Sequence, residues 1–96
     1  MSYTEKDYER FEEKMGRPNE VTGCIPWAGC YQSTGYGYFY LDGKMMTAHR
    51  AAHLLYIGPI PDGQLVHHKC ERRSCCNFRH LEAVTYKQHM AIHYGE

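Results

Sequence analysis

The chain contains no apolar run near the ~20 residues that a membrane-spanning helix requires. Its first ten residues are charged and lack the apolar stretch of a secretory signal peptide. Proteins that stay in a reducing compartment rarely form disulfides. The sequence therefore predicts a cytoplasmic, intracellular protein with free thiols and no membrane partner.

A net charge is absent as well, because 11 basic and 11 acidic side chains give a formal charge of +0 at pH 7. The charges are unevenly placed: residues 1–20 hold six acids and four bases, whereas residues 21–96 hold seven bases and five acids. All seven histidines fall in the second part. This weak basic excess permits nucleic-acid binding without requiring it.

The length of 96 residues allows one domain. A hydrophobic content of 43% is enough for a core, but a chain this short buries only roughly 60–65% of the surface that its unfolded form exposes, and it usually needs an additional staple. Its five cysteines are an odd number, which in a reducing cell favours metal binding over disulfides.

Residues 1–20 are predicted to form an N-terminal amphipathic helix. Thr4, followed three positions later by Asp7, is typical of a helix start, and apolar side chains then recur at helical spacing. Gly16 and Pro18 end the pattern. We expect this helix to pack on the edge of the domain that follows.

Residues 21–96 are predicted to form one domain of the α+β class. The dipeptide Asp42-Gly43 favours a two-residue hairpin turn. Thr85 and Gln88 form a capping box that opens a last helix. The predicted elements are strands at 25–31, 36–41 and 44–48, a helix at 49–57, strands at 64–68 and 80–84 around a loop at 69–79, and a helix at 86–94.

Three candidate metal ligands lie in one polar loop, in the pattern Cys70-x4-Cys75-x4-His80. Thiolates and imidazoles in sets of four are the ligands of tetrahedral structural zinc. Cys24 and Cys30 are both candidates for the fourth position. Bound zinc contributes roughly 10–16 kcal/mol to the folding of small domains, so we predict a zinc-stapled fold.

A second group of residues has the chemistry to hydrolyse a phosphodiester. His67-His68 ends a predicted strand, Asn77 lies in the loop, and His89 lies on the last helix. Hydrolysis needs a base that takes a proton from water and a cation that stabilises the charge developing on the phosphate. A neutral histidine suits the base, a helix histidine can hold the cation, and an asparagine can brace the loop. Adjacent histidines are more often structural, so spacing alone leaves this a hypothesis.

Several side chains are candidates for DNA contact. Tyr36 and Tyr38 share one face of the predicted hairpin, which could enter a major groove. The alternative is that these tyrosines cover the core with their hydroxyls outward. The basic side chains that could contact phosphates are Lys44, Arg50, Arg72 and Arg79, although each could equally be a solvated surface charge.

Three further residues are interpreted as packing rather than chemistry. His49 and His53 share one face of a predicted helix, where we expect them to lie between helix and sheet. Cys76 adjoins Cys75 and cannot easily point the same way. We therefore predict that Cys76 is buried and binds no metal.

The ordered set of motifs after residue 21 resembles a known family. Single pieces of the pattern are weak, but their order is specific. The matching residues are Gly23-Cys24 with Trp27 and Gly29, Gly35-Tyr36-Gly37, Ala48-His49-Arg50, Gly58-Pro59-Ile60-Pro61-Asp62-Gly63, His68-x-Cys70, Cys75-x-Asn77-x-x-His80-Leu81 and Thr85. The sequence is similar to the HNH endonucleases of the His-Me finger (ββα-metal) superfamily, of the small phage and intron-encoded type, and to the related His-Cys box homing endonucleases.

This resemblance implies roles for individual residues. His68 corresponds to the general base and Asn77 to the loop asparagine of the motif. His89 falls where such enzymes bind the catalytic cation, and His67 occupies the position of a second cation ligand in some of them. The structural zinc ligands correspond to Cys24, Cys70, Cys75 and His80, which favours Cys24 over Cys30.

The resemblance also implies a fold and an activity. The fold would end in a ββα-metal unit, and the activity would be metal-dependent cleavage of DNA, as nicking by a monomer or double-strand cleavage by a homodimer. The helix position of His89 is commonly Asn in the closest relatives, so the catalytic cation could be Zn²⁺, Ni²⁺ or Mn²⁺ rather than Mg²⁺. A phage-encoded enzyme would act in the host cell. The alternative is a non-catalytic zinc module that binds DNA or protein; a third possibility is an RNA-directed nuclease.

Overall fold

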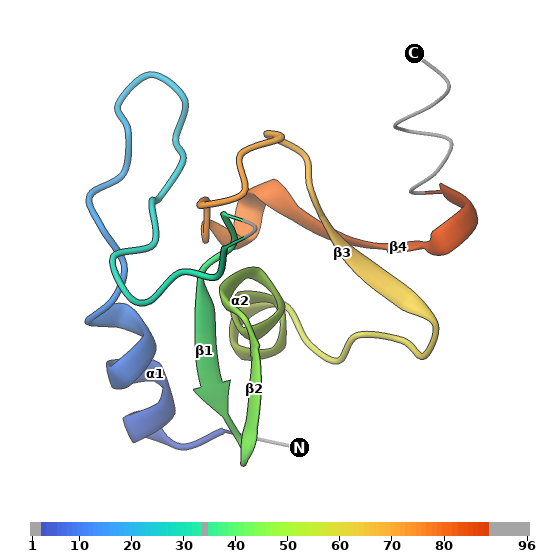
Figure 1. Ribbon diagram of the computed structural model, residues 1–96, viewed down its shortest axis with the longest axis horizontal. Helices are drawn as coiled ribbons and strands as arrows, with labels where there is room; N and C mark the ends of the chain where they lie inside the picture. Colours follow the sequence, from blue (N-terminus) through green and yellow to red (C-terminus); the bar gives the residue numbers. More distant parts are fainter. Residues whose placement is uncertain (1–2, 34, 89–96) are drawn as a thin grey trace.

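The computed structural model describes residues 3–33 and 35–88, which form a small α+β structure (Figure 1). Within these residues, two separate two-stranded antiparallel sheets flank a central helix, α2, which contacts both of them. The elements are α1 (Glu5–Glu12), β1 (Tyr38–Leu41), β2 (Lys44–Thr47), α2 (Ala48–Tyr56), β3 (Gln64–His68), the 3-10 helix η1 (Phe78–His80) and β4 (Leu81–Thr85).

Helix α1 begins at the predicted cap. The Thr4 N–H donates to an Asp7 carboxylate oxygen at 3.0 Å, and the Asp7 N–H donates to the Thr4 hydroxyl at 3.3 Å, which completes a capping box. The helix buries Phe11 completely, and the Tyr8 hydroxyl donates to the Leu55 carbonyl at 2.6 Å. The N-terminal helix therefore contributes to the core of the domain.

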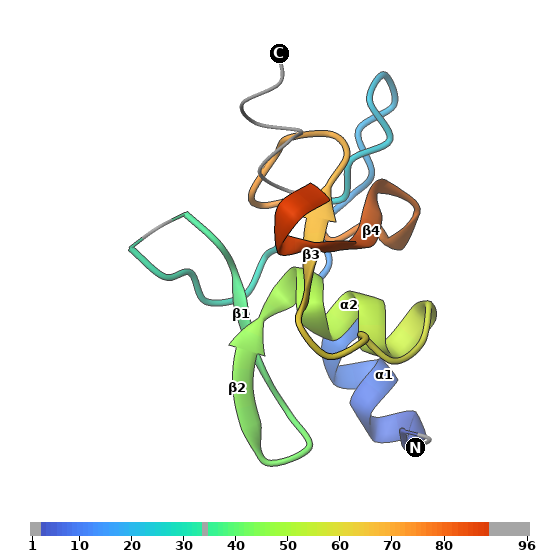
Figure 2. The ribbon, with the colours of Figure 1, turned by 90° about the vertical axis from the view of Figure 1, so that its right-hand side faces the viewer.

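Both β-hairpins form where the sequence predicts them. In the first, Leu41 pairs with Lys44, and the two turn residues have positive φ (52° for Asp42 and 77° for Gly43), as a type I′ turn requires. The second pairs β3 with β4, in register from Gln64 opposite Thr85 to His68 opposite Leu81. In both views the turn of the first hairpin lies at the opposite end of the molecule from the loop at 69–77 (Figure 2).

The predicted strand at 25–31 is wrong. Pro26 has no N–H to donate, and the extended segment around it makes only isolated bridges, on two sides. On one side the Gly16 N–H donates to the Pro26 carbonyl at 2.8 Å, and on the other the Cys76 N–H donates to the Ile25 carbonyl at 2.8 Å. The segment thereby joins the region after α1 to the cysteine-rich loop.

Three aromatic rings form the centre of the core. Phe11 lies 4.9 Å from Trp27 and 5.2 Å from Phe39 between ring centroids, the latter pair edge-to-face. The backbone of Gly37 passes directly against the indole, since a Cβ there would lie 2.1 Å from Trp27 Cδ1. Only glycine fits this close approach without a shift of the core.

The capping box predicted for the last helix is present. The Thr85 N–H donates to Gln88 Oε1 at 2.9 Å, and the Gln88 N–H donates to the Thr85 hydroxyl at 3.0 Å. Residues 86–88 are helical, while the rest of the predicted helix at 86–94 lies outside the described residues. Among the described residues, no helix has the length and apolar character needed to cross a membrane.

Candidate functional site

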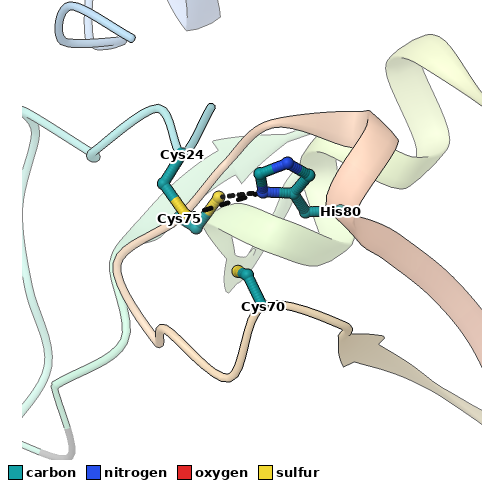
Figure 3. Close-up of side chains that lie close together, drawn as sticks. All are labelled: Cys24, Cys70, Cys75 and His80. Carbon is teal, nitrogen blue, oxygen red and sulfur yellow. Dashed lines mark hydrogen bonds between the residues drawn. The ribbon is translucent and has the colours of Figure 1, made fainter. Parts of the chain in front are cut away.

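Four candidate metal ligands converge from segments far apart in the sequence (Figure 3). The ligand atoms of Cys24, Cys70, Cys75 and His80 all lie within 4.8 Å of one another. His80 Nδ1 lies 3.5 Å from Cys24 Sγ and 3.5 Å from Cys75 Sγ. In a tetrahedral zinc site with bonds of about 2.3 Å to sulfur and about 2.0 Å to nitrogen, S and N are separated by roughly 3.5 Å. The geometry of the cluster therefore fits zinc.

Local hydrogen bonds place Cys24 in this cluster. Asn19 Oδ1 accepts from the N–H groups of Val21 and Thr22, at 2.8 and 2.9 Å, and folds the chain into a tight turn. The Thr22 hydroxyl then accepts from the Cys24 N–H at 3.2 Å. Of the two candidates that the sequence left open, Cys24 is buried beside the other ligands, whereas Cys30 is exposed and lies outside the cluster.

Burial controls the protonation of the neighbouring thiols. It raises the pKa of Cys75 to about 12 and the pKa of Cys76 to about 12. Zinc binding at Cys75 would therefore have to displace a proton. Cys76 is 1% exposed, packs in the core, and its thiol donates to the Ile25 carbonyl at 3.2 Å, as expected of a packing residue.

Asn77 braces the loop that carries these ligands. Its Nδ2 donates to the Gly23 carbonyl at 2.6 Å, next to Cys24, and its Oδ1 accepts from the Arg79 N–H at 3.0 Å. The second bond caps η1, the short helix that ends in His80. The asparagine thus links two of the chain segments that supply metal ligands.

His68 ends β3 beside the metal cluster and is 7% exposed. Its Nε2 lies 2.9 Å from the Cys75 carbonyl, which can only accept, so Nε2 carries the proton and Nδ1 keeps a lone pair. Burial lowers the pKa of His68, and the nearby His67 lowers it further, against the opposing effect of the Cys75 hydrogen bond. At neutral pH the side chain is therefore a neutral imidazole with a free basic nitrogen.

Two other rings contact His68, and the sequence did not identify them as part of its surroundings. The His49 centroid lies 4.4 Å from that of His68, and the Tyr36 ring is stacked on His68 with centroids 6.0 Å apart. Burial, together with the charges of His68 and Arg50, lowers the pKa of His49 to about 3, so this ring is neutral as well. The motif Ala48-His49-Arg50 was the one feature of the sequence that pointed to His49. Its spacing does not show that His49 contacts His68.

Of the two predicted ligands of a catalytic cation, the structure describes only His67. His67 is 8% exposed and pairs across the hairpin with Glu82. Because neighbours in a strand face opposite sides, His67 and His68 could meet one substrate only at the end of β3. His89 lies outside the described residues.

The predicted DNA-contacting residues lie on several segments of the chain and differ in burial. Tyr36 is half-buried against His68, while Lys44 begins β2 next to the hairpin turn, away from the metal cluster. Tyr38 and Arg50 are half-buried, and Arg79 is exposed with its guanidinium 5.9 Å from the Phe78 ring centroid.

A cavity of about 200 Å³ adjoins two of the metal ligands, Cys24 and Cys75. Exposed Arg72 lines it, together with Arg17 and Ser74. Two arginines and a serine therefore line the same cavity as the two cysteines.

Comparison with known proteins supports the resemblance. The family described as HNH endonuclease matches residues 47–91, which include α2, both strands of the second hairpin and the cysteine-rich loop. Protein 7.7 of Escherichia phage T7 is 41% identical over 64 residues, which cover 67% of this chain but 49% of that protein. The uncharacterized gene 5.3 protein of Enterobacteria phage T3 is 35% identical over 77 residues, covering 72% of this chain and 75% of that protein.

No solved structure matches the chain. This chain spans about half the length of the phage T7 protein and three quarters of the phage T3 protein. The family match includes His68, Asn77 and the three loop ligands of the metal cluster, and the match to the phage T3 protein extends the similarity over most of the chain. The chain belongs to the HNH endonuclease family.

Proposed function

We propose that this protein is a metal-dependent DNA endonuclease in which His68 is the general base. The family suggests a nuclease in general terms, and one observation supports the specific proposal. The hydrogen bond from His68 Nε2–H to the Cys75 carbonyl holds the imidazole in the tautomer whose Nδ1 can accept a proton. A buried, neutral and oriented imidazole is the form of histidine that activates water.

In the proposed reaction, His68 Nδ1 takes a proton from a water molecule, whose oxygen attacks the phosphorus of the scissile phosphodiester. The bond between the phosphorus and O3′ breaks, and O3′ takes up a proton from solvent, which leaves a 5′-phosphate and a 3′-hydroxyl. His67 and His89 are the proposed ligands of a divalent cation, Mg²⁺, Mn²⁺, Ni²⁺ or Zn²⁺. Such a cation would supply positive charge to the scissile phosphate and to the leaving oxygen.

We assign the Cys24, Cys70, Cys75 and His80 cluster a structural zinc. These four protein side chains would fill the four positions of a tetrahedral zinc ion and leave none for substrate, as in structural rather than catalytic zinc sites. Asn77 would act through this centre, because its hydrogen bond to the Gly23 carbonyl holds together two segments that carry ligands. The zinc centre in turn would fix the Cys75 carbonyl that accepts the His68 Nε2–H hydrogen bond and so sets the tautomer of His68.

DNA would be held chiefly through its phosphates. The candidate contacts are Arg72, next to the metal cluster, together with Tyr36, Tyr38, Lys44, Arg50 and Arg79. One active site in a monomer should nick one strand, and a homodimer could cut both. The similarity to phage proteins supports action in an infected host cell.

The proposal is tested by incubating supercoiled plasmid with the full chain and Mg²⁺, Mn²⁺, Ni²⁺, Zn²⁺ or EDTA, beside His68→Ala. A matched control is His53→Asn, which changes a buried histidine that lies outside the proposed site. We expect cation-dependent nicking that falls by about 10²–10⁴ in His68→Ala and persists in the control. An RNA of the same sequence tests the RNA-directed alternative.

The opposite outcome is equally informative. If the folded, zinc-loaded protein cleaves neither DNA nor RNA with any cation, the proposal is wrong. DNA retention in a gel-shift assay without cleavage would then support the non-catalytic zinc module.

A further inference from the structure

Three aromatic rings from different parts of the chain meet at the proposed base. Tyr36 precedes β1, His49 lies in the first turn of α2, and His68 ends β3. The centroid distances are 4.4 Å for His49 to His68, 5.2 Å for Tyr36 to His49 and 6.0 Å for Tyr36 to His68. The three rings therefore form one compact triangle, in which the Tyr36 and His68 planes are inclined by only 22°.

The hydrogen bond to Cys75 is not sufficient to orient the His68 ring. The second side-chain torsion of histidine has a broad energy minimum, and a bond at Nε2 leaves the ring free to turn about the line from Cβ toward that atom. Such a turn would swing Nδ1 away from a water molecule while the hydrogen bond persisted. Contacts on the flat faces of the ring are what oppose this rotation.

We propose that Tyr36 and His49 are positioning residues that fix the plane of the His68 imidazole. This inference rests on the proposed function, because it assigns these residues a part in the reaction performed at His68. It gives Tyr36 a different role from the DNA contact predicted from its place on the hairpin. It also gives His49 a role in the reaction, where its helical spacing had indicated packing alone.

The surroundings of the two rings suit this role. The Arg73 guanidinium lies 5.5 Å from the Tyr36 ring centroid and holds that ring from a third side. α2 contacts both β1 and β3, and this packing brings rings from three segments together.

His53 provides the matched comparison on the same helix. It is 4% exposed and lies one turn after His49, but its Nδ1 is 2.8 Å from the Gly58 carbonyl at the end of α2. His53 therefore stabilises the end of α2. A change at His53 should affect stability without changing the orientation of His68.

The experiment compares plasmid nicking by the full-length His49→Ala, His49→Phe and His53→Phe proteins, each checked for folding and zinc content. We expect His49→Ala to lower kcat by about ten- to a hundredfold with KM within about threefold, because a misplaced base affects the chemical step. His49→Phe retains a flat ring and should restore kcat to within about threefold of the original protein. His53→Phe should stay within the same limit.

Three results would overturn the inference: an unchanged kcat in folded His49→Ala, an equal loss in His53→Phe, or no rescue by His49→Phe. If His49→Ala does not fold, His49→Leu fills the same space with a side chain that is not flat, and its kcat should still fall by at least about fivefold.

A second readout does not depend on cleavage. In NMR spectra His68 should keep its Nε2–H form in every variant, since the hydrogen bond to Cys75 persists. The nuclear Overhauser contacts of its ring protons should fit one ring orientation in the original protein and in His49→Phe, but an average of orientations in His49→Ala. A single unchanged ring orientation in all three would refute the positioning role. If the original protein does not cleave DNA but the expected NMR change is seen, the proposed function is wrong. The inference that the neighbouring rings fix the His68 plane would then still hold.

Discussion

Removal of one metal ligand, by Cys70→Ser, should unfold the domain. Folded proteins are stable by about 0.05–0.15 kcal/mol per residue, so a chain of 96 residues has about 5–14 kcal/mol in total. Structural zinc contributes roughly 10–16 kcal/mol in small domains. The free energy that is lost with the zinc centre is therefore comparable with the whole free energy of unfolding.

The topology of the centre supports this magnitude. A link between Cys24 and Cys70 closes a loop of about 46 residues, which in the chain-entropy relation for cross-links corresponds to about 4 kcal/mol. Hydrophobic burial in the core can hardly compensate for the loss of this cross-link, because few large side chains are fully buried. Backbone pairing between the segment at 25–27 and the cysteine-rich loop is limited to one isolated bridge, Pro26 with Cys75, among the described residues.

The assay is urea unfolding followed by far-UV circular dichroism, with zinc content measured on the same samples. Cys30→Ser is the control, since Cys30 is exposed and outside the cluster. We expect Cys30→Ser to unfold at the original midpoint with one zinc per chain, and Cys70→Ser to be unfolded without denaturant. A folded, zinc-free Cys70→Ser protein, or equal effects of the two substitutions, would refute the reasoning.

Three further predictions concern individual contacts. Asn77→Ala removes both side-chain hydrogen bonds of the loop and should lower the free energy of unfolding by about 1–3 kcal/mol; an unchanged urea midpoint would contradict this. Gly37→Ala should cost about 1–3 kcal/mol by displacing Trp27. Thermal melts should show a larger loss than for Gly63→Ala, whose Cβ would meet no atom within 4 Å and whose cost comes only from a φ of +77°. His49 stays neutral in the folded protein down to pH about 3, whereas the unfolded chain binds a proton there below about pH 6.5. Stability should therefore fall as the pH falls, with a slope from this residue that approaches about 1.4 kcal/mol per pH unit, and zinc-saturated His49→Phe should show a smaller slope over pH 5.5–7.

Elements that depend on residues close in the sequence were predictable. The Thr4–Asp7 capping box and the Asp42-Gly43 turn each act over three or four positions, so that their side chains and backbone torsions are determined locally. The strands of the second hairpin formed near their predicted positions, although β4 begins one residue later than predicted because His80 ends η1. Their pairing is not local in this sense, since it joins Gln64 to Thr85 across a long loop. The strand predicted at 25–31 failed, since hydrophobicity favoured it while Pro26 and its partners on two sides prevented a regular ladder.

The sequence by itself determined the chemistry available: thiols and imidazoles at the spacing of a zinc site, a histidine pair at a strand end, and an asparagine in the loop between. The spacing alone left Cys24 and Cys30 both open and the family resemblance favoured Cys24; the tertiary structure then placed Cys24 beside Cys70, and only it brought His49 against His68. These choices depend on how α2 and the segment at 25–27 pack against distant parts of the chain. Contacts between residues far apart in sequence follow from the packing of whole elements, which no local pattern of residues contains.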